Sequence, residues 1–211
     1  MLTLVDAFFF LGHEEFTGRP VLSRTSLGIG LAGAALCDLL FTDRITVERG
    51  KVRPIAGRPP GIPTADHVFS AIISETGTHR VRDWVDHLRR ELPSIAGDNL
   101  VAHGLVRRTP DRVLLRRRPR YPPADLLVST AARARARAAV FGVDRPDPHA
   151  ACLALLAWTA GVDDLCAPEL GRAQVRAWMA DTHHALPRRI SDVVDGVAAV
   201  AAAVVYTGDR K

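Results

Sequence analysis

Residues 25–41 place the strongest constraint on the fold, because apolar side chains recur there at helical spacing and small residues lie between them. The apolar positions are Leu27, Leu31, Ala34, Ala35 and Leu39, and the small ones are Gly28, Gly30, Ala32 and Gly33. The glycines also form a Gly-x-Gly-x-x-Gly pattern, which in dinucleotide-binding proteins follows a strand. No strand precedes it here, so we interpret the pattern as a helix that packs closely against its neighbours.

The rest of the chain also favours helices. Its 211 residues suffice for one well-buried domain, and the hydrophobic share of 47% with only 6% aromatic residues is typical of a helical rather than a β-sandwich protein. Further helices are expected near 2–11, 64–74, 80–92, 95–102, 124–140, 147–159, 169–181 and 189–205. Thr64 is expected to cap the second of these, and His183 and His184 to end the seventh, before Pro187.

Two segments have the pattern of β-hairpins. Residues 44–54 alternate apolar and polar side chains on either side of an Arg-Gly turn. In residues 104–118 we expect one arm up to Arg108, a turn at Thr109–Asp111 and a second arm from Arg112. The predicted fold class is therefore mainly α: a single helical domain over residues 1–211 with two short β-hairpins, one protruding and Arg-rich.

The cysteines, the N-terminal residues and the longest apolar run indicate the cellular compartment. Cys37, Cys152 and Cys166 are an odd number without metal-ligand spacing, which is typical of reduced core thiols. The N-terminal residues do not have the pattern of a secretory signal. The longest apolar run, 197–206, is about half of the roughly 20 residues that a membrane span needs. We expect a cytoplasmic protein whose membrane contact is peripheral, on the inner face.

Arginine is concentrated in one stretch. Ten arginines lie between Arg107 and Arg137 against Asp111 and Asp125, a local charge of +8 within a total of +5. Such self-repulsion indicates an anionic partner: phosphate, lipid headgroup or nucleic acid. A solvated arginine-rich face in a GC-biased bacterial genome is the alternative. Nucleic acid is the less favoured partner, because the only aromatic residues near the stretch are Tyr121 and Phe141, and we expect Phe141 to be buried.

Catalytic, cofactor and metal sites find no support in the sequence. His183 and His184 are adjacent, so they point in different directions on a helix, and no His-x-x-x-His or Cys-x-x-Cys spacing occurs. The acidic pairs at 14–15 and 163–164 are not singled out by any further pattern, and no Gly-x-Ser-x-Gly elbow is present. We expect a protein that is not an enzyme and that needs no cofactor.

The order of segments resembles a known family. The residues that carry this resemblance are Thr3–Gly12 (TLVDAFFFLG), the polar loop after them, Gly30–Leu40 (GLAGAALCDLL), Asp43–Val47 (DRITV), Asp98–Val106 (DNLVAHGLV) and the HAACLALLA run within 147–161. Together they resemble the Golgi phosphoprotein 3 family over nearly the whole chain. The resemblance implies a mostly helical single domain with a protruding hairpin. Eukaryotic members bind phosphatidylinositol 4-phosphate at the Golgi membrane and recruit glycosyltransferases through their cytoplasmic tails.

The residues of the family's headgroup pocket are only partly present. Ser23 and Ala32 stand where the family has a tryptophan and an arginine, and Pro93 stands at one of two further arginine positions. Arg90 matches the other, and Arg89 is beside it. The residues expected to bind anionic headgroups are Arg89, Arg90, Arg107, Arg108, Arg116, Arg117 and Arg118. The resemblance also implicates the hairpin in self-association and membrane contact.

The apolar run of the second hairpin, Val113, Leu114 and Leu115, is the expected contact surface. A two-stranded ribbon is marginal alone, so it must rest on the body, on a second subunit or on a membrane. The expected partners are therefore anionic lipid headgroups, protein clients and a second copy of the chain.

Overall fold

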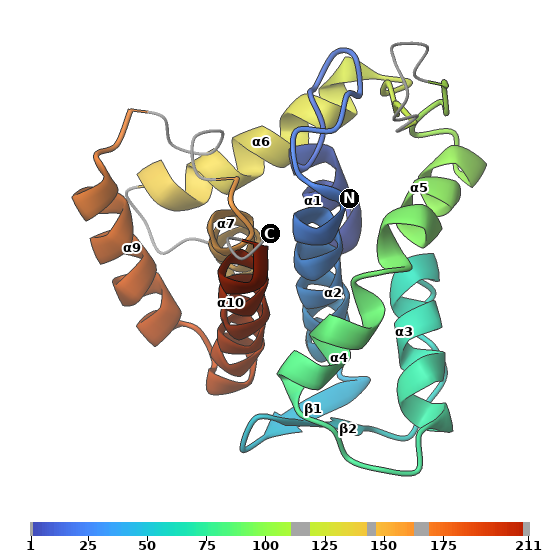
Figure 1. The fold of residues 1–211 in the computed structure, drawn as a ribbon, viewed down its shortest axis with the longest axis vertical. Helices are drawn as coiled ribbons and strands as arrows, with labels where there is room; N and C mark the ends of the chain where they lie inside the picture. The colour runs from blue at the N-terminus through green and yellow to red at the C-terminus, as the bar shows by residue number, and fades with distance from the viewer. Residues whose placement is uncertain (1, 111–118, 143–146, 163–168, 209–211) are drawn as a thin grey trace.

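The computed structural model describes residues 2–110, 119–142, 147–162 and 169–208. These residues form nine helices and one two-stranded antiparallel sheet, so the predicted mainly-α class is confirmed (Figure 1). The helices are α1 (Leu4–Leu11), α2 (Arg24–Phe41), α3 (Pro63–Ser74), α4 (Val81–Leu88), α5 (Leu92–Ala102), α6 (Leu126–Phe141), α7 (Pro148–Thr159), α9 (Arg172–Ala185) and α10 (Arg188–Gly208). The strands are β1 (Ile45–Glu48) and β2 (Lys51–Pro54).

Helix α2 runs through the centre of the molecule, in contact with α1, α3, α4, α5, α7 and α10. Its glycines make this possible. A Cβ atom at Gly28 would lie 1.8 Å from the Arg89 carbonyl oxygen, and one at Gly30 would lie 1.8 Å from the Phe8 ring. A Cβ at Gly33 would meet Val197 of α10 at 2.6 Å. The interpretation of the glycines as sites of close packing is confirmed.

By length and composition, α2 is also apolar enough to cross a membrane. Most of it is buried within the fold, where its side chains belong to the same cluster of buried residues as those of α1, α7 and α10. Long apolar core helices pass the same test, so we assign α2 to the core.

The α1 helix begins against the middle of the core. Thr3 caps it by accepting the Asp6 backbone N–H, and the carboxylate of Asp38, on α2, accepts those of Leu4 and Val5 at 3.1 Å each. Asp38 is only 4% exposed. Burial raises its pKa to about 7, an effect larger than the opposing one of the two backbone N–H groups.

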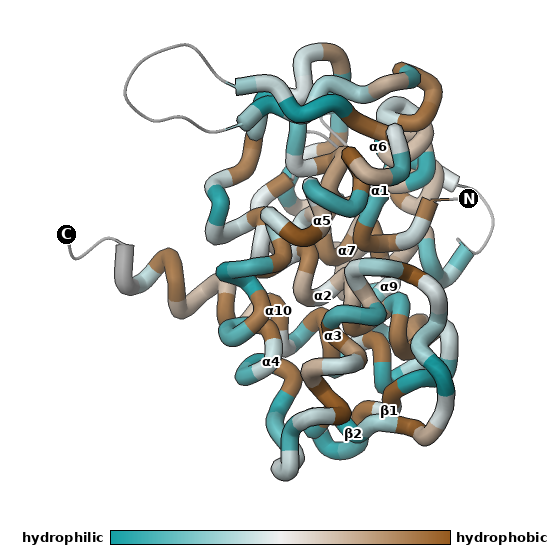
Figure 2. The backbone as a smooth tube through the Cα atoms, turned by 90° about the vertical axis from the view of Figure 1, so that its right-hand side faces the viewer, coloured by the Kyte–Doolittle hydropathy of each residue, from teal (hydrophilic) through white to brown (hydrophobic). Residues whose placement is uncertain are grey.

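The β1–β2 hairpin lies at one end of the molecule (Figure 2), where α2 and α3 finish (Figure 1). Ile45 pairs with Pro54 and Glu48 with Lys51, as the alternation in 44–54 predicted. Arg49 and Gly50 at the turn both have positive φ, 53° and 71°, which is the conformation that two-residue hairpin turns require. The buried Val47 and Val52 attach the hairpin to the core.

The hairpin predicted in residues 104–118, which we call the second ribbon, pairs residues 105–109 with 120–124 and so differs in register from the prediction. Thr109 and Arg120 exchange backbone hydrogen bonds, Arg107 N–H donates to Pro122, and Ala124 N–H donates to Leu105. The arms are thus 105–109 and 120–124, joined in the described residues by two isolated β-bridges rather than by continuous strands. The predicted turn at Thr109–Asp111 is wrong, because Thr109 is paired with Arg120. Residues 111–118 lie outside the described part of the chain.

Two smaller predictions are also wrong. Helix α3 begins at Pro63 rather than with Thr64 as its cap, because proline suits the first helical position and Thr64 instead accepts a hydrogen bond from Asn99. Helix α9 runs from Arg172 to Ala185, later than the expected 169–181, and its last turn carries His183 and His184.

The described cysteines behave as expected. Cys37 of α2 and Cys152 of α7 are free thiols with no exposed surface. Cys166 lies outside the described residues.

Candidate functional site

The second ribbon is fixed to the helical body through Tyr121. A Cβ atom at Gly18, in the α1–α2 loop, would lie 2.0 Å from the Tyr121 backbone, and one at Gly97, on α5, would lie 2.8 Å from its hydroxyl. The Tyr121 N–H donates to the Gly18 carbonyl at 2.9 Å. Tyr121 is 7% exposed, so two glycines make the space for this buried ring. The sequence analysis did not single out either glycine for this role.

Tyr121 belongs to a group of three rings. The His13 ring stacks on Phe9 with centroids 4.3 Å apart, and both face Tyr121 edge-on, at 5.5 and 5.1 Å. The Nδ1 atom of His13 lies 2.7 Å from the Phe9 carbonyl oxygen and so acts as the donor. Burial lowers the pKa of His13 to about 4, so the ring is neutral near pH 7 and its Nε2 atom carries a lone pair.

A small cavity of about 70 Å³ opens beside these rings, where α1, α2, α5 and the ribbon meet. Its lining is Phe9, His13, Pro20, Leu22, Arg24, Leu27, Pro93, Pro119 and Tyr121. Most of these side chains are apolar, and Arg24 is the charged one. The cavity can therefore take a small apolar group, while the Arg24 guanidinium can meet an anionic group attached to it.

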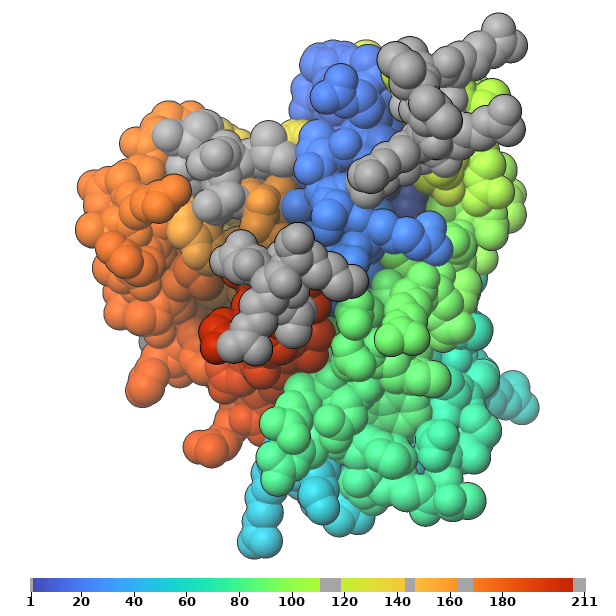
Figure 3. All heavy atoms as spheres, viewed as in Figure 1, coloured from blue at the N-terminus to red at the C-terminus, as the bar shows by residue number. Residues whose placement is uncertain are grey.

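Arg24, which lines this cavity, contacts the α4–α5 junction that carries Arg89 and Arg90. Gly28 lets α2 approach the backbone of Arg89, and the Arg24 guanidinium donates to the Arg90 carbonyl oxygen at 3.2 Å and to Ser94 Oγ at 2.8 Å. Figure 3 shows the α1–α2 segment and the α4–α5 segment in contact on this face. The sequence analysis selected Arg89 and Arg90 but missed Arg24, which directly follows the matched position Ser23.

These three arginines differ in how their charge is balanced. Arg89 Nε lies 2.7 Å from the Asp86 carboxylate, so much of its charge is already neutralised. Arg24 and Arg90 are exposed and have no carboxylate partner among the described residues. Ser23 and Ala32 are not available to hold a headgroup. Ser23 caps α2 by accepting the Ser26 N–H, and Ala32 is fully buried.

Arg107 and Arg108, on the second ribbon, also differ in whether a carboxylate neutralises their charge. Arg108 is bound to the Asp98 carboxylate and donates to the Tyr121 hydroxyl at 3.2 Å, with its guanidinium 5.5 Å from that ring. Arg107 is exposed and, in the described part of the chain, lacks an acidic partner. Arg116, Arg117 and Arg118, and the expected contact residues Val113, Leu114 and Leu115, lie outside the described residues.

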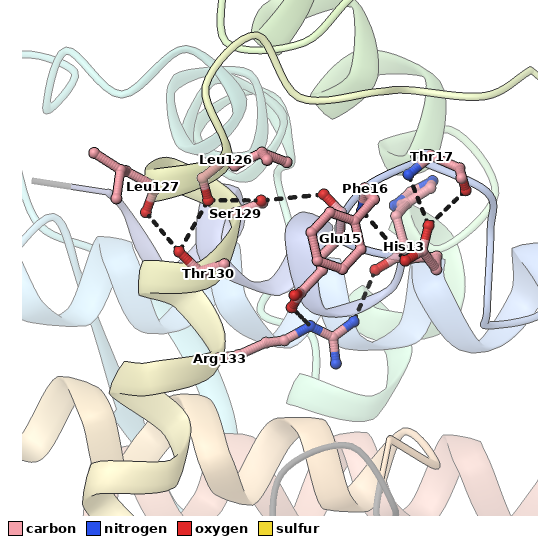
Figure 4. Close-up of polar contacts among 10 residues, drawn as sticks. His13, Glu15, Phe16, Thr17, Leu126, Leu127, Ser129, Thr130 and Arg133 are labelled. Carbon is pink, nitrogen blue, oxygen red and sulfur yellow. Dashed lines mark hydrogen bonds and ion pairs between the residues drawn. The ribbon is translucent and has the colours of Figure 1, made fainter.

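The α6 arginines form ion pairs within the molecule. Arg133 pairs with Glu15 at 3.1 Å and donates to the His13 carbonyl oxygen at 3.0 Å, so it fastens the α1–α2 loop to α6 (Figure 4). Arg135 pairs with Asp147 at 3.3 Å, on another face of the helix. Arg137 pairs with Glu169 at 2.8 Å. The stretch is thus less basic on its surface than its sequence indicates.

The surroundings of Arg137 correct one further expectation. Phe141 is 42% exposed rather than buried, because it ends α6 one turn after Arg137, whose guanidinium lies 5.2 Å from its ring.

The histidine pair of α9 does not form a metal site with other described side chains. His183 Nε2 lies 2.9 Å from the carboxylate of Asp195, on α10. The described residues contain no group of three His, Cys, Asp or Glu side chains able to hold a metal ion.

The fold and the site define a helical protein with a mainly apolar pocket that is lined by one arginine, Arg24. The model of one family, Golgi phosphoprotein 3 (GPP34), matches residues 4–205, and the chain belongs to this family. The role of this family is lipid binding and adaptor function, which is compatible with the prediction of a protein that is not an enzyme. A search of curated proteins gave no match to the chain.

Proposed function

We propose that the protein is a peripheral membrane protein that binds anionic lipid headgroups on the cytoplasmic face of a membrane and acts as an adaptor for protein clients. The observation that carries this proposal is that Arg24 lines an apolar cavity and bonds to the backbone of Arg90, an exposed arginine at the adjoining α4–α5 junction. A guanidinium can hold phosphate oxygens with paired hydrogen bonds, and apolar walls suit the adjoining part of an amphiphile. The adaptor part rests on family membership.

The distribution of unpaired charge supports lipid over nucleic acid. Arg133, Arg135 and Arg137, which would form the long basic surface that a nucleic acid needs, have carboxylate partners. Arg19, Arg24, Arg90 and Arg107 are exposed and lack such partners among the described residues. They lie on the segments that border the cavity: the α1–α2 loop, the start of α2, the α4–α5 junction and the second ribbon. Basic residues placed around one small cavity suit one or a few headgroups better than a long polyanion.

The test is co-sedimentation with vesicles of phosphatidylcholine, alone or mixed equally with phosphatidylglycerol. Wild-type protein should sediment only with the anionic vesicles and should be released by salt, because surface attraction decays over about 8 Å at physiological ionic strength. Replacing both Arg24 and Arg90 with alanine should weaken binding about tenfold to thirtyfold, at about 1 kcal/mol for each basic residue.

The matched control replaces Arg58 and Arg176, two exposed arginines away from the cavity, with alanine. It removes the same charge and should retain most of the binding. Equal binding of wild-type protein to neutral and anionic vesicles would contradict the proposal. Displacement of the protein from anionic vesicles by a low concentration of duplex DNA would favour the nucleic-acid alternative instead.

A further inference from the structure

Three large apolar side chains are exposed on two neighbouring segments at the end of the molecule opposite the β1–β2 hairpin. Phe16, in the α1–α2 loop, is 60% exposed, and Leu126 and Leu127, in the first turn of α6, are 46% and 75% exposed. Figure 1 shows this loop and the start of α6 at the same end, next to the second ribbon. Large apolar side chains exposed on neighbouring segments are typical of a contact surface.

The loop that carries Phe16 is held in place by polar contacts on both sides. Within the loop, Glu14 accepts the Thr17 N–H at 2.7 Å and the Thr17 hydroxyl at 2.6 Å. Across to α6, Ser129 Oγ donates to the Glu15 carbonyl oxygen at 3.2 Å, and Arg133 pairs with the Glu15 carboxylate (Figure 4). Phe16 is therefore exposed on a fixed loop, and its exposure is built into the fold.

These contacts also bring the loop beside Leu126. The Ser129 hydroxyl shares its single proton between the Glu15 carbonyl oxygen, at 3.2 Å, and that of Leu126, one turn earlier on α6, at 3.0 Å. Leu127 follows directly, with its N–H bound to the Asp125 carboxylate that caps the helix. Phe16, Leu126 and Leu127, which we call the apolar tip, thus lie on either side of a single contact between the loop and the helix.

We propose that the apolar tip inserts into the interfacial region of an anionic bilayer. Charge favours this occupant, because Arg19 on the same loop and Arg107 on the adjoining ribbon are exposed without carboxylate partners among the described residues. Size favours it too. Three side chains are far fewer than the roughly 20 to 30 residues that each partner contributes to a stable protein interface. A few apolar side chains beside basic ones suffice for interfacial binding.

The inference rests on the proposed function but is tested by a different signal. Phe16→Trp should show fluorescence quenching by brominated phosphatidylcholine, in vesicles that also contain phosphatidylglycerol, beyond that of the three native tryptophans in wild-type protein. The matched control is Ile73→Trp, at a position 53% exposed on α3, in the half of the molecule that carries the β1–β2 hairpin. It should show no added quenching.

A second variant measures affinity. Replacing Phe16, Leu126 and Leu127 with serine should weaken binding to the same vesicles about tenfold, since part of their apolar surface leaves water on insertion. Ile73→Ser should bind as wild-type protein does. An unchanged thermal unfolding temperature verifies that the serine variant is folded. If the serine variant is unfolded, the quenching of Phe16→Trp alone tests the inference.

The outcomes separate the two proposals. Vesicle binding that needs Arg24 and Arg90, without added quenching of Phe16→Trp, would overturn the inference and leave the proposed function standing. Absence of vesicle binding by wild-type protein would overturn both. A serine variant that keeps its vesicle affinity but loses self-association in solution would identify the apolar tip as a protein contact and would also overturn the inference.

Discussion

The carboxylate of Asp38 accepts the backbone N–H of Leu4 at 3.1 Å, so the central helix caps the first helix of the fold from the side. The same carboxylate also accepts the N–H of Val5. A buried acid in this position stabilises a helix start whose donors would otherwise lack partners, but it must be removed from water to do so.

The pKa of Asp38 makes stability depend on pH. Its folded-state pKa of about 7 is above the ordinary value of 3.8, so the stabilisation is complete below pH 3.8 and is lost as pH rises through 7. Over that window the loss approaches about 4 kcal/mol, at about 1.4 kcal/mol for each pKa unit. Asp38→Asn should be less stable than wild-type protein at pH 5 and should compare more favourably at pH 8. Urea unfolding at the two pH values measures this, and an equal difference at both would contradict it.

His13 should have the opposite effect. Its pKa falls from 6.5 to about 4, so its contribution is present above pH 6.5 and is lost as pH falls through 4, by about 3 kcal/mol. Between about pH 4 and 6.5 the slopes from His13 and Asp38 oppose each other. His13→Asn, which can still donate to the Phe9 carbonyl oxygen, should therefore reveal a stability that falls with rising pH. A pH profile parallel to that of wild-type protein would show that His13 does not titrate in this way.

Gly28→Ala should disturb the packing of α2 against the α4–α5 junction beside the cavity. The added methyl group would lie 1.8 Å from the Arg89 carbonyl oxygen, so α2 and the α4–α5 junction must separate. Overpacking of this kind costs about 1–3 kcal/mol, which denaturant unfolding would detect. Gly57→Ala is the control, because its methyl group would meet no atom closer than 3.7 Å. Equal stability of the two variants would contradict the expected contact.

Arg133→Gln should loosen the α1–α2 loop. The substitution removes the ion pair with Glu15 and the charged donor to the His13 carbonyl oxygen, at a cost of about 1–3 kcal/mol for a largely buried group. Arg137→Gln is the control, because its pair with Glu169 is more exposed and should contribute less to stability. Hydrogen exchange should increase in residues 13–19 for the first variant alone.

Selectivity for phosphatidylinositol 4-phosphate over other anionic lipids should be absent. Ser23, Ala32 and Pro93 stand at three of the four family pocket positions and cannot supply the donors of a guanidinium. Vesicles matched in total charge, with this lipid or with phosphatidylglycerol, should bind the protein equally. A clear preference for the phosphoinositide would show that Arg24 and Arg90 form a selective pocket after all.

The helices were predictable because their signals are local. The spacing of apolar residues in 25–41 and the glycines between them define α2 without knowledge of its neighbours. The register of the second ribbon was not predictable, because it depends on a contact between Tyr121 and Gly18, which are distant in sequence. The partners of the arginines could not be predicted for the same reason. Charge counting cannot reveal that Arg133 reaches Glu15, or that Arg24 reaches Arg90, since folding alone brings these segments together.

The second ribbon has a consequence for assembly. On the outer edge of its 120–124 arm, the Tyr121 N–H is already bound to Gly18, and Pro119 and Pro123 have no N–H to give. This edge therefore offers no backbone donor to an incoming strand, and proline on a sheet edge is known to block such pairing. The ribbon is protected against uncontrolled strand addition along this edge. Any second copy of the chain that associates there must be recognised through side chains, which makes such association specific and open to change by single substitutions.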